Sequence, residues 1–324
     1  VVLGHITGMY NVPYIDQIED ILYDTRVRLS APGGIDERIV IVAIDEASLQ
    51  EHGHWPFTRE KFAAMMNNLT AYGAAVVGFD VLFAERDESA DVDLLRELAA
   101  QEGDAGFVET LNMFEPLLDR DRLFAEAMQN VPTVLGYYFD SNPETAFQTG
   151  TLPYPAFELH ESMGDSIFLP RGEGFASNLP VLMDSAYSAG FINNPLIDSD
   201  GVVRRTPLLH EFKLAVYESL AQAVASTYLN DITLPIFVDA SRWMGDYRPL
   251  EGLELAGRPI PIDPQGAVLV PYRGARGSFP YVSIGDVISG RVEDPSVFEG
   301  HIALVGATAP GMEDLRTTPF GSIY

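Results

Sequence analysis

One short apolar run, Ile39 to Ile44, most constrains what this chain can fold into. Its six residues are all aliphatic, and an acidic pair, Asp45 and Glu46, follows at once. A continuous run of this kind, without helical spacing, is typical of a strand that is buried on both faces of a parallel sheet. Two later runs, at 74–80 and 301–308, share its form. The sequence therefore predicts an α/β protein.

The segment between the first two runs indicates how they are connected. Apolar residues three or four apart between Thr58 and Gly73 predict a helix that Thr58 caps and Gly73 ends. A strand, a helix and a strand with short joints form a right-handed βαβ unit with parallel strands. Short runs at 250–258, 260–262 and 267–272, interrupted by Pro and Gly, predict an antiparallel edge. We expect a mixed, largely parallel central sheet with flanking helices.

A separate helix is predicted before this sheet. Between residues 13 and 28 apolar side chains alternate at steps of three and four, which indicates one narrow apolar stripe. The breaker Pro32-Gly33-Gly34 ends the segment. We expect residues 1–34 to form a stalk-like helix and a linker. Two interpretations are open: a helix that docks on its own domain, or a stalk that passes motion to a membrane segment.

Residues 35–324 are expected to form a single α/β domain. Two stretches of this domain, at about 84–116 and 141–182, have poor periodicity and are interpreted as surface elaborations. A further helix is predicted at 215–228, where inward-facing apolar residues recur at helical spacing.

The charge of the chain excludes some partners. With 47 acidic and 20 basic side chains in 324 residues, the net charge is −27. Such a surface repels nucleic acid and anionic lipid headgroups, so neither is expected to bind. The absence of cysteine excludes disulfides and thiol catalysis. No run reaches the roughly 18 apolar residues of a membrane span, and because the sequence begins at Val1 we expect a piece of a longer protein.

Acidic side chains follow the predicted parallel strands. Asp45 and Glu46 follow the first strand, Asp80 the second, and Asp314 comes after the last. Ligands of open α/β sheets bind at the carboxyl ends of the strands, so these four are candidate ligand-binding residues. Asp45, Asp80 and Asp314 are also candidate ligands for Mg²⁺ or Ca²⁺, which prefer oxygen. The alternative is structural, because aspartates at strand exits commonly cap helices or accept hydrogen bonds from loop amides.

Two further side chains are candidates for ligand binding, each with a structural alternative. Arg204, one of the few basic residues, is expected either to neutralise carboxylates or to bind an anion, and we favour the first. Trp55 beside Pro56 is interpreted as a cover on the end of the sheet rather than an aromatic shelf. The glycine turn at 306–311 lacks the lysine of a phosphate loop, and no nucleophile elbow occurs. We expect no catalytic residue and no cofactor in this chain.

Several segments together resemble the type 2 CHASE domain (cyclases/histidine kinases associated sensory extracellular). Asn193 and Thr308 lie in these segments and join the candidate ligand-binding residues. The matching segments are Tyr23-Asp24-x-Arg26-x-Arg28, IVIVAIDEASL at 39–49, Gly53 to Arg59, GAAVVGFDVLFAE at 73–85, Gly190 to Asn193, Asp200-Gly201-x-x-Arg204 and LVGATAPGMEDLRTTPFG at 304–321.

The resemblance implies the extracellular or periplasmic sensory input domain of a membrane-anchored bacterial receptor. It implies transmembrane helices outside this chain and a cytoplasmic output, such as an adenylate or guanylate cyclase, a histidine or Ser/Thr kinase or a diguanylate cyclase. The stimulus, a small molecule or a physical one, is unknown, and we expect a homodimer in the full-length receptor. Two alternatives are an extracytoplasmic metal-dependent hydrolase that uses the strand-end carboxylates, and a scaffold module that only sets dimer geometry.

Overall fold

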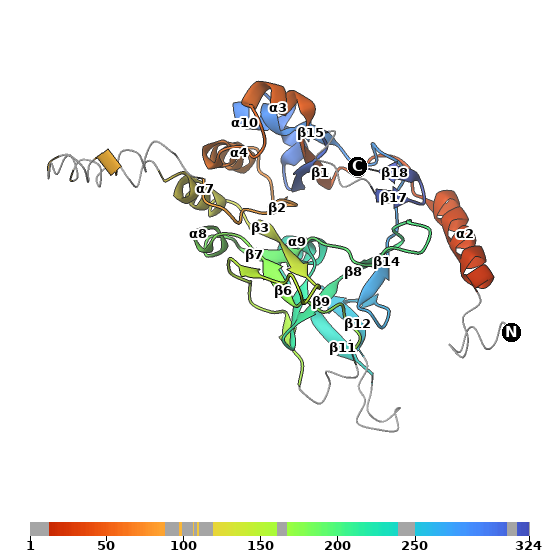
Figure 1. Cartoon of the computed structure of the whole chain (residues 1–324). Coiled ribbons are helices and arrows are strands. Elements are labelled where there is room, and N and C mark those ends of the chain that lie inside the picture. Colours follow the sequence, from red (N-terminus) through yellow and green to blue (C-terminus); the bar gives the residue numbers. More distant parts are fainter. Residues whose placement is uncertain are drawn as a thin grey trace.

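A central sheet of eight strands organises the part of the chain that this computed structural model describes, residues 13–87, 97–98, 106, 109, 119–160, 167–238, 250–309 and 316–323. The strand order is β15-β1-β16-β2-β3-β6-β4, and β7 also pairs with β3 (Figure 1). The strands are β1 (Ile39–Ile44), β2 (Val76–Phe79), β3 (Thr133–Asp140), β4 (Gln148–Thr149), β6 (Gly174–Ala176), β7 (Ser188–Phe191), β15 (Tyr281–Ser283) and β16 (Ile302–Ala307).

The middle of this sheet is parallel. The three runs predicted as buried parallel strands are β1, β2 and β16, and β16 lies between the other two, with Ile302 paired to both Ile39 and Val76. β3 and β15 continue the sheet in parallel, whereas β6 runs antiparallel to β3. The predicted mixed, largely parallel sheet with flanking helices and an antiparallel edge is thereby confirmed.

The two faces of the sheet carry different helices. Helices α4 (Arg59–Ala71), α7 (Arg120–Met128) and α10 (Ile284–Ser289) share one buried cluster with Val77 and Phe79. Helix α9 (Leu220–Leu229) packs in another cluster with Val76, Val134 and Ile302. Because neighbouring residues of a strand point to opposite faces, the alternation of Val76 and Val77 places α9 on the face opposite α4.

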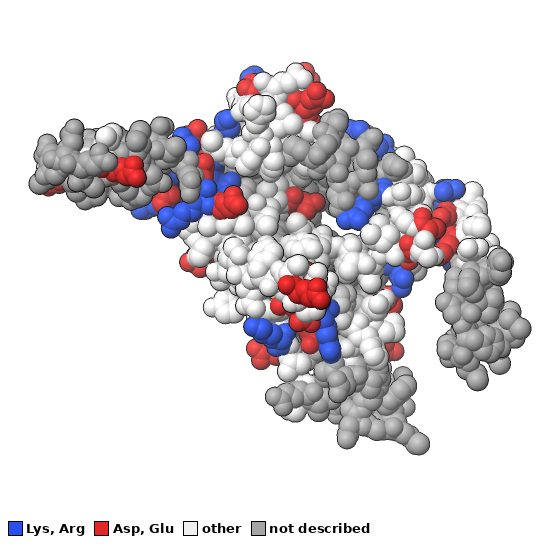
Figure 2. Space-filling view, in the orientation of Figure 1, with Lys and Arg blue, Asp and Glu red and all other residues white. Residues whose placement is uncertain are grey.

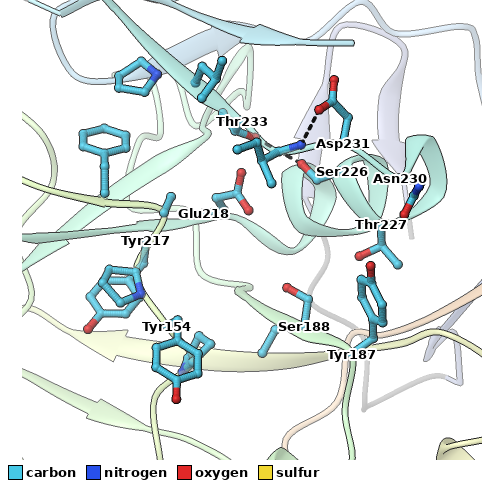
Figure 3. A pocket seen from close by; sticks show the side chains of 18 residues that line it. Tyr154, Tyr187, Ser188, Tyr217, Glu218, Ser226, Thr227, Asn230, Asp231 and Thr233 are labelled. Carbon is cyan, nitrogen blue, oxygen red and sulfur yellow. Dashed lines mark hydrogen bonds between the residues drawn. The ribbon is translucent and has the colours of Figure 1, made fainter.

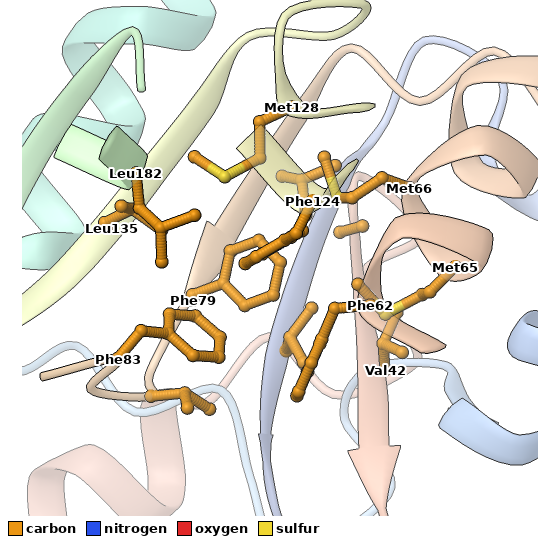
Figure 4. Packing of buried hydrophobic residues seen from close by; sticks show 14 of the residues in the cluster. Val42, Phe62, Met65, Met66, Phe79, Phe83, Phe124, Met128, Leu135 and Leu182 are labelled. Atoms are coloured by element: carbon orange, nitrogen blue, oxygen red, sulfur yellow. The ribbon is translucent and has the colours of Figure 1, made fainter. Parts of the chain in front are cut away.

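Aromatic side chains fill the larger of these two interfaces. The rings of Phe62 on α4 and Phe124 on α7 lie 5.5 Å apart, and both contact Phe79 and Phe83 edge to face or tilted (Figure 4). All four side chains are buried. Such pairs add roughly 0.5–1.5 kcal/mol each beyond the burial of their surface, so this cluster stabilises the packing of α4 and α7 on β2.

Smaller antiparallel sheets build a second region below the central sheet, around a cluster that includes the fully buried Leu209, Val216 and Leu253 (Figure 1). The strands predicted between 250 and 272 are present, but they belong to these separate sheets. Their strands are β5 (Phe157–Glu158), β8 (Arg205–Pro207), β9 (Leu209–Phe212), β10 (Ala215–Glu218), β11 (Leu234–Phe237), β12 (Leu250–Leu255), β13 (Arg258–Pro261) and β14 (Ala267–Leu269).

The predicted helix at 215–228 is wrong in its first turn. Residues 215–218 form β10, which makes a hairpin with β9 through a turn in which Lys213 and Leu214 have positive φ. Helix α9 begins only at Leu220, and the Ser219 side chain accepts a hydrogen bond from the Gln222 amide at its start. Apolar residues at 216 and 217 suit a buried strand as well as a helix, and the pairing with β9 decides between them.

The predicted first helix is present as α2 (Pro13–Ser30), which lies at one side of the molecule beside β14, β17 (Arg316–Thr318) and β18 (Gly321–Ile323) (Figure 1). Among the helices of the described residues, none is both long enough and apolar enough to cross a membrane. Short elements α3 (Glu46–His52), α8 (Pro180–Met183) and η3 (Pro295–Phe298) complete the fold. Most of the expected elaboration at 84–116 lies outside the described residues.

Candidate functional site

Asp45 lies at the carboxyl end of β1, where it caps helix α3. Its side chain accepts hydrogen bonds from the Ser48 amide (2.9 Å) and from the Ser283 hydroxyl on β15 (2.9 Å). The neighbouring Glu46 is exposed in the first turn of α3, where a carboxylate stabilises the helix dipole. The contacts of Asp45 therefore match the structural alternative, a helix cap.

The ends of the parallel strands do meet, as their order requires. Asp45 and Thr308 line one cavity of about 330 Å³. Asp80 directly follows the last residue of β2. A Cβ added to Gly306 would lie 3.7 Å from the Asp80 Cβ, so Asp80 is next to the end of β16. Asp314 lies outside the described residues, and within them no group of three His, Asp or Glu side chains is arranged to hold a metal ion.

Trp55 is partly buried over the aromatic cluster. Its ring lies edge-on to Phe57 (5.6 Å) and to Phe62 (6.0 Å), and it forms part of the wall of a 350 Å³ cavity with Arg59. These contacts are those of a cover on the end of the sheet.

The Asn193 side chain makes the backbone hydrogen bonds that the next residue of a neighbouring strand would otherwise make to β3. Its Oδ1 accepts from the Phe139 amide (3.0 Å) and its Nδ2 donates to the Phe139 carbonyl (3.2 Å). The side chain thus satisfies both backbone groups where β7 ends and β3 continues. Gly190, earlier in the same segment, is required for another reason, because a Cβ there would lie 2.5 Å from the backbone of Leu220.

Arg204 joins helix α2 to the body of the protein. Its guanidinium is 4% exposed and forms a bidentate pair with Asp24 of α2 (2.8 and 3.0 Å). The same group binds Asp198 (3.0 Å) and Asp200 (2.7 Å) in the preceding turn, and Asp20 of α2 lies 3.8 Å away. We call these five side chains the Arg204 cluster. The preferred interpretation of Arg204, pairing with carboxylates, describes all of its contacts.

The charges within the Arg204 cluster are unbalanced. Hydrogen bonds from Arg204 lower the pKa of Asp200. Burial, opposed by Arg204 and assisted by the other carboxylates, raises the pKa of Asp20. The carboxylates hold the pKa of Arg204 above its usual value, chiefly through its hydrogen bonds with Asp24. Arg204 therefore faces four carboxylates, two from α2 and two from the turn, and Arg205 also pairs with one of them, Asp198 (3.2 Å).

Two other polar contacts attach α2. The Tyr23 hydroxyl donates to the Val270 carbonyl (3.0 Å), and Arg28 Nε donates to the Pro319 carbonyl. Figure 2 shows acidic and basic side chains lying next to one another where α2 meets the rest of the surface. From residue 17 onward, the contacts that hold the helix to the domain are directed polar bonds.

A larger cavity, of about 520 Å³, lies between the segment 153–157, the start of β7, the end of β10 and the residues that follow α9 (Figure 3). Sequence reasoning missed it. Its walls include the rings of Tyr154, Tyr187 and Tyr217, and the Glu218 carboxylate points into it between them and Ser226. Cavities of 300–1,000 Å³ are the usual size for small-molecule sites.

Glu218 is the charged group at the wall of this cavity. Burial raises the pKa of the carboxylate and outweighs the opposing effect of the nearby Thr233 and Ser226 hydroxyls. Its Oε1 atom is buried without a hydrogen-bond partner. The Tyr137 hydroxyl is also buried and unpaired, and burial raises the pKa of Tyr137.

No local motif could have revealed this cavity, because its residues come from four short segments between 153 and 235. The one available signal was Glu218 itself, an acidic residue after the apolar Val216-Tyr217 and immediately before a helix. That position resembles the strand-end aspartates, but the predicted helix through 215–228 concealed it.

The comparisons with known proteins agree with these motifs over the whole chain. The family model of the CHASE2 domain matches residues 1–324. No curated protein matches the chain, and no solved structure does. CHASE2 is a sensory rather than a catalytic domain, and it forms the extracellular part of signalling receptors. The chain, from its first helix to its closing glycine turn, therefore belongs to the CHASE2 family of extracellular sensory domains.

Proposed function

We propose that this CHASE2 domain is the extracytoplasmic input of a membrane-anchored bacterial receptor and that helix α2 carries its signal. The observation that carries this proposal is the Arg204 cluster. Arg204 and its neighbours Asp198 and Asp200 belong to the sensory domain, whereas Asp20 and Asp24 belong to α2. A stimulus that moves the 198–204 turn therefore acts directly on the helix.

The physical chemistry of the cluster favours a two-state attachment. Breaking a buried ion pair by removing one partner costs roughly 3–5 kcal/mol, because the remaining charge is left unpaired. Without the Arg204 guanidinium, Asp20 and Asp24 of α2 face Asp200 of the turn without a cation between them, while Asp198 keeps its bond to Arg205. Small displacements of the turn are thus converted into attachment or release of α2, which is the kind of bistable element that signalling requires.

The outward side of α2 supports a partner for this movement, a second copy of the same helix. At 100° per residue, Tyr23, Asp20 and Asp24 lie on the side that faces the domain. The opposite side carries apolar residues that are exposed in the single chain: Ile18 (57%), Leu22 (56%) and Leu29 (83%). Receptors of this kind would pair through this stripe, and release of α2 by the domain would change the pairing.

The test uses a substitution that loosens α2 without unpairing the turn. Asp24→Asn removes one charge from α2 and leaves Asp198 and Asp200 on Arg204. We expect faster backbone hydrogen exchange in α2 of the isolated chain, and an output that no longer depends on the stimulus in the full-length receptor. Glu19→Gln is the matched control, because Glu19 is an exposed acid on the same helix. Equal exchange and equal regulation in the two variants would contradict the proposal.

This assignment gives the chain no catalytic residue and no cofactor, and it leaves the type of cytoplasmic output, cyclase or kinase or diguanylate cyclase, to the segments that follow. The alternative of a metal-dependent hydrolase depended on Asp45, Asp80 and Asp314, of which Asp314 lies outside the described residues. Asp45 has both helix-cap and cross-strand hydrogen bonds. Measurement of bound metal in the purified chain separates the two functions, because a stoichiometric ion would favour the hydrolase.

A further inference from the structure

The cavity beside Glu218 is built from parts that are stiff and in part exposed to solvent. Tyr154 is 99% exposed and stands between two prolines, Pro153 and Pro155, which restrict the backbone on either side. Tyr187 on the opposite wall is 62% exposed. Both aromatic rings line the 520 Å³ cavity and offer flat apolar surfaces to whatever enters it.

The charge of the cavity limits the ligand. Glu218 and Asp231 both line it, and among the described residues of its wall none is Lys, Arg or His. The Asp231 carboxylate already accepts backbone hydrogen bonds from Ile232 (2.8 Å) and Ala256 (3.0 Å), so it contributes negative potential rather than a free acceptor. An anionic ligand would enter against two carboxylates without a compensating cation.

Glu218 supplies the acceptor. Oε1 is buried and unpaired, and the nearby hydroxyls of Ser226 and Thr233 hydrogen-bond to each other (3.1 Å), so at most one of their two protons can reach the carboxylate. A buried acceptor without a donor costs roughly 1–3 kcal/mol, and more when charged, and a ligand N–H group would remove this penalty. A cationic N–H group does so with a charge-assisted bond, about twice as strong as a neutral one.

The rings favour a cation for a second, independent reason. The faces of tyrosine rings carry negative partial charge and attract ammonium groups within about 6 Å. Tyr154, Tyr187 and Tyr217 line the same space as Glu218 (Figure 3). An aromatic wall beside a carboxylate is complementary to an ammonium head with an apolar body, whereas a carboxylate ligand has no partner there.

We propose that the cavity lined by Glu218, Tyr154 and Tyr187 binds a small protonated amine, whose ammonium group donates to the Glu218 carboxylate. This inference rests on the proposed sensory function, for which it names the chemical class of stimulus. The cavity lies apart from the Arg204 cluster, with no residue in common. Failure of amine binding would therefore leave the hydrogen-exchange test of α2 unaffected.

Three probes with the same alkyl chain test the proposal: n-butylammonium, n-butanol and butyrate, each added to the 324-residue chain at pH 7.5 and constant ionic strength. Alkylamines are protonated at this pH, as lysine is. A ligand that binds only the folded state raises the unfolding midpoint by mass action. We expect n-butylammonium to raise the midpoint and to bind saturably in calorimetry, and n-butanol and butyrate to do neither.

Variants connect binding to the cavity. Glu218→Gln removes the charge and is expected to weaken n-butylammonium binding roughly tenfold or more, because the bond to a charged group is lost. Tyr154→Ala, at an exposed position that does not endanger folding, is expected to weaken it severalfold. Glu251→Gln, an exposed charge removal on β12, should leave affinity unchanged. Stabilisation by n-butanol equal to that by n-butylammonium, or unchanged affinity in both cavity variants, would overturn the proposal.

Discussion

His210 is a buried histidine whose surroundings favour the neutral ring. It is 1% exposed, stacks on Phe139 at 4.4 Å and meets Phe191 edge-on, and burial lowers its pKa to about 4 despite the Glu211 carbonyl 3.2 Å from Nδ1. In the unfolded chain the pKa of histidine is about 6.5. As pH falls below 6.5 the unfolded state takes up the proton first, so stability is complete above about pH 6.5 and declines until about pH 4.

Replacing this histidine by phenylalanine should therefore reduce the loss of unfolding free energy that occurs as the pH is lowered. His210→Phe keeps a ring in the stack and removes the titrating group. Between pH 7 and pH 4 the native chain should lose on the order of 3 kcal/mol that the variant does not lose. Urea unfolding at several pH values measures the difference, and the carboxylates, which titrate in both proteins, cancel. Parallel curves for the two proteins would show that His210 does not titrate as inferred.

Asn193 provides a stability test that separates a structural role from a ligand role. Asn193→Ala leaves the Phe139 amide and carbonyl without their partners, which should lower the free energy of unfolding by about 1–3 kcal/mol. Asn142→Ala, in an exposed turn, is the comparison. Thermal or urea unfolding measures both. Unchanged stability in Asn193→Ala would mean that its side chain is available for a ligand after all.

For single residues, the sequence indicates which positions are important more reliably than it indicates the role of each side chain. Asp45, Asn193 and Arg204 stand in recognisable segments, and each has a defined set of partners. Phe139, the partner of Asn193, is 54 positions away, and Ser283, one partner of Asp45, is 238 positions away. Local patterns do not encode such separations. Whether a strand-end aspartate caps a helix or faces a ligand depends on such distant groups, so the pattern alone left both interpretations open.

The apolar stripe of α2 predicts a contact between two copies of the receptor. Because the chain contains no cysteine, one substitution introduces a single thiol into it. Leu22→Cys places that thiol in the exposed stripe, and oxidation of receptor-containing membranes should then yield a covalent dimer. Gln17→Cys is exposed but lies about a third of a turn from the stripe, and it should cross-link far less. Equal cross-linking at both positions, or none at Leu22, would argue against pairing through this stripe.

Helices and strands with a strong hydrophobic pattern could be predicted from the sequence. Strands whose conformation depends on pairing with a distant strand could not. The runs that form β1, β2 and β16 are apolar enough to require burial on both faces, and α2 and α4 have clear helical spacing. The strand β10 is short, and Ala215–Glu218 fits either state until β9 pairs with it. The position of β16 between β1 and β2 depends on a connection of more than two hundred residues, which no local rule predicts.

The whole molecule carries a net charge of −27, and this excess is a property of its surface rather than of one site. Like charges are closest together in the folded state, so their mutual repulsion destabilises the folded state relative to the unfolded one. Added NaCl screens charges beyond about 10 Å at 0.1 M, so it should weaken this repulsion more than it weakens the close, buried bonds of Arg204.

We therefore expect the unfolding midpoint to rise when NaCl is increased from about 0.01 M to about 0.5 M at pH 8, where every exposed carboxylate is ionised. The same salt series at pH 4.5 is the control, because partial protonation of the carboxylates reduces the net charge and should reduce the slope. The Asp24→Asn variant should keep the pH 8 slope, since the repulsion arises from the entire surface and one charge in −27 changes it little. A midpoint that falls with salt at pH 8 would mean that favourable surface pairs outweigh the repulsion.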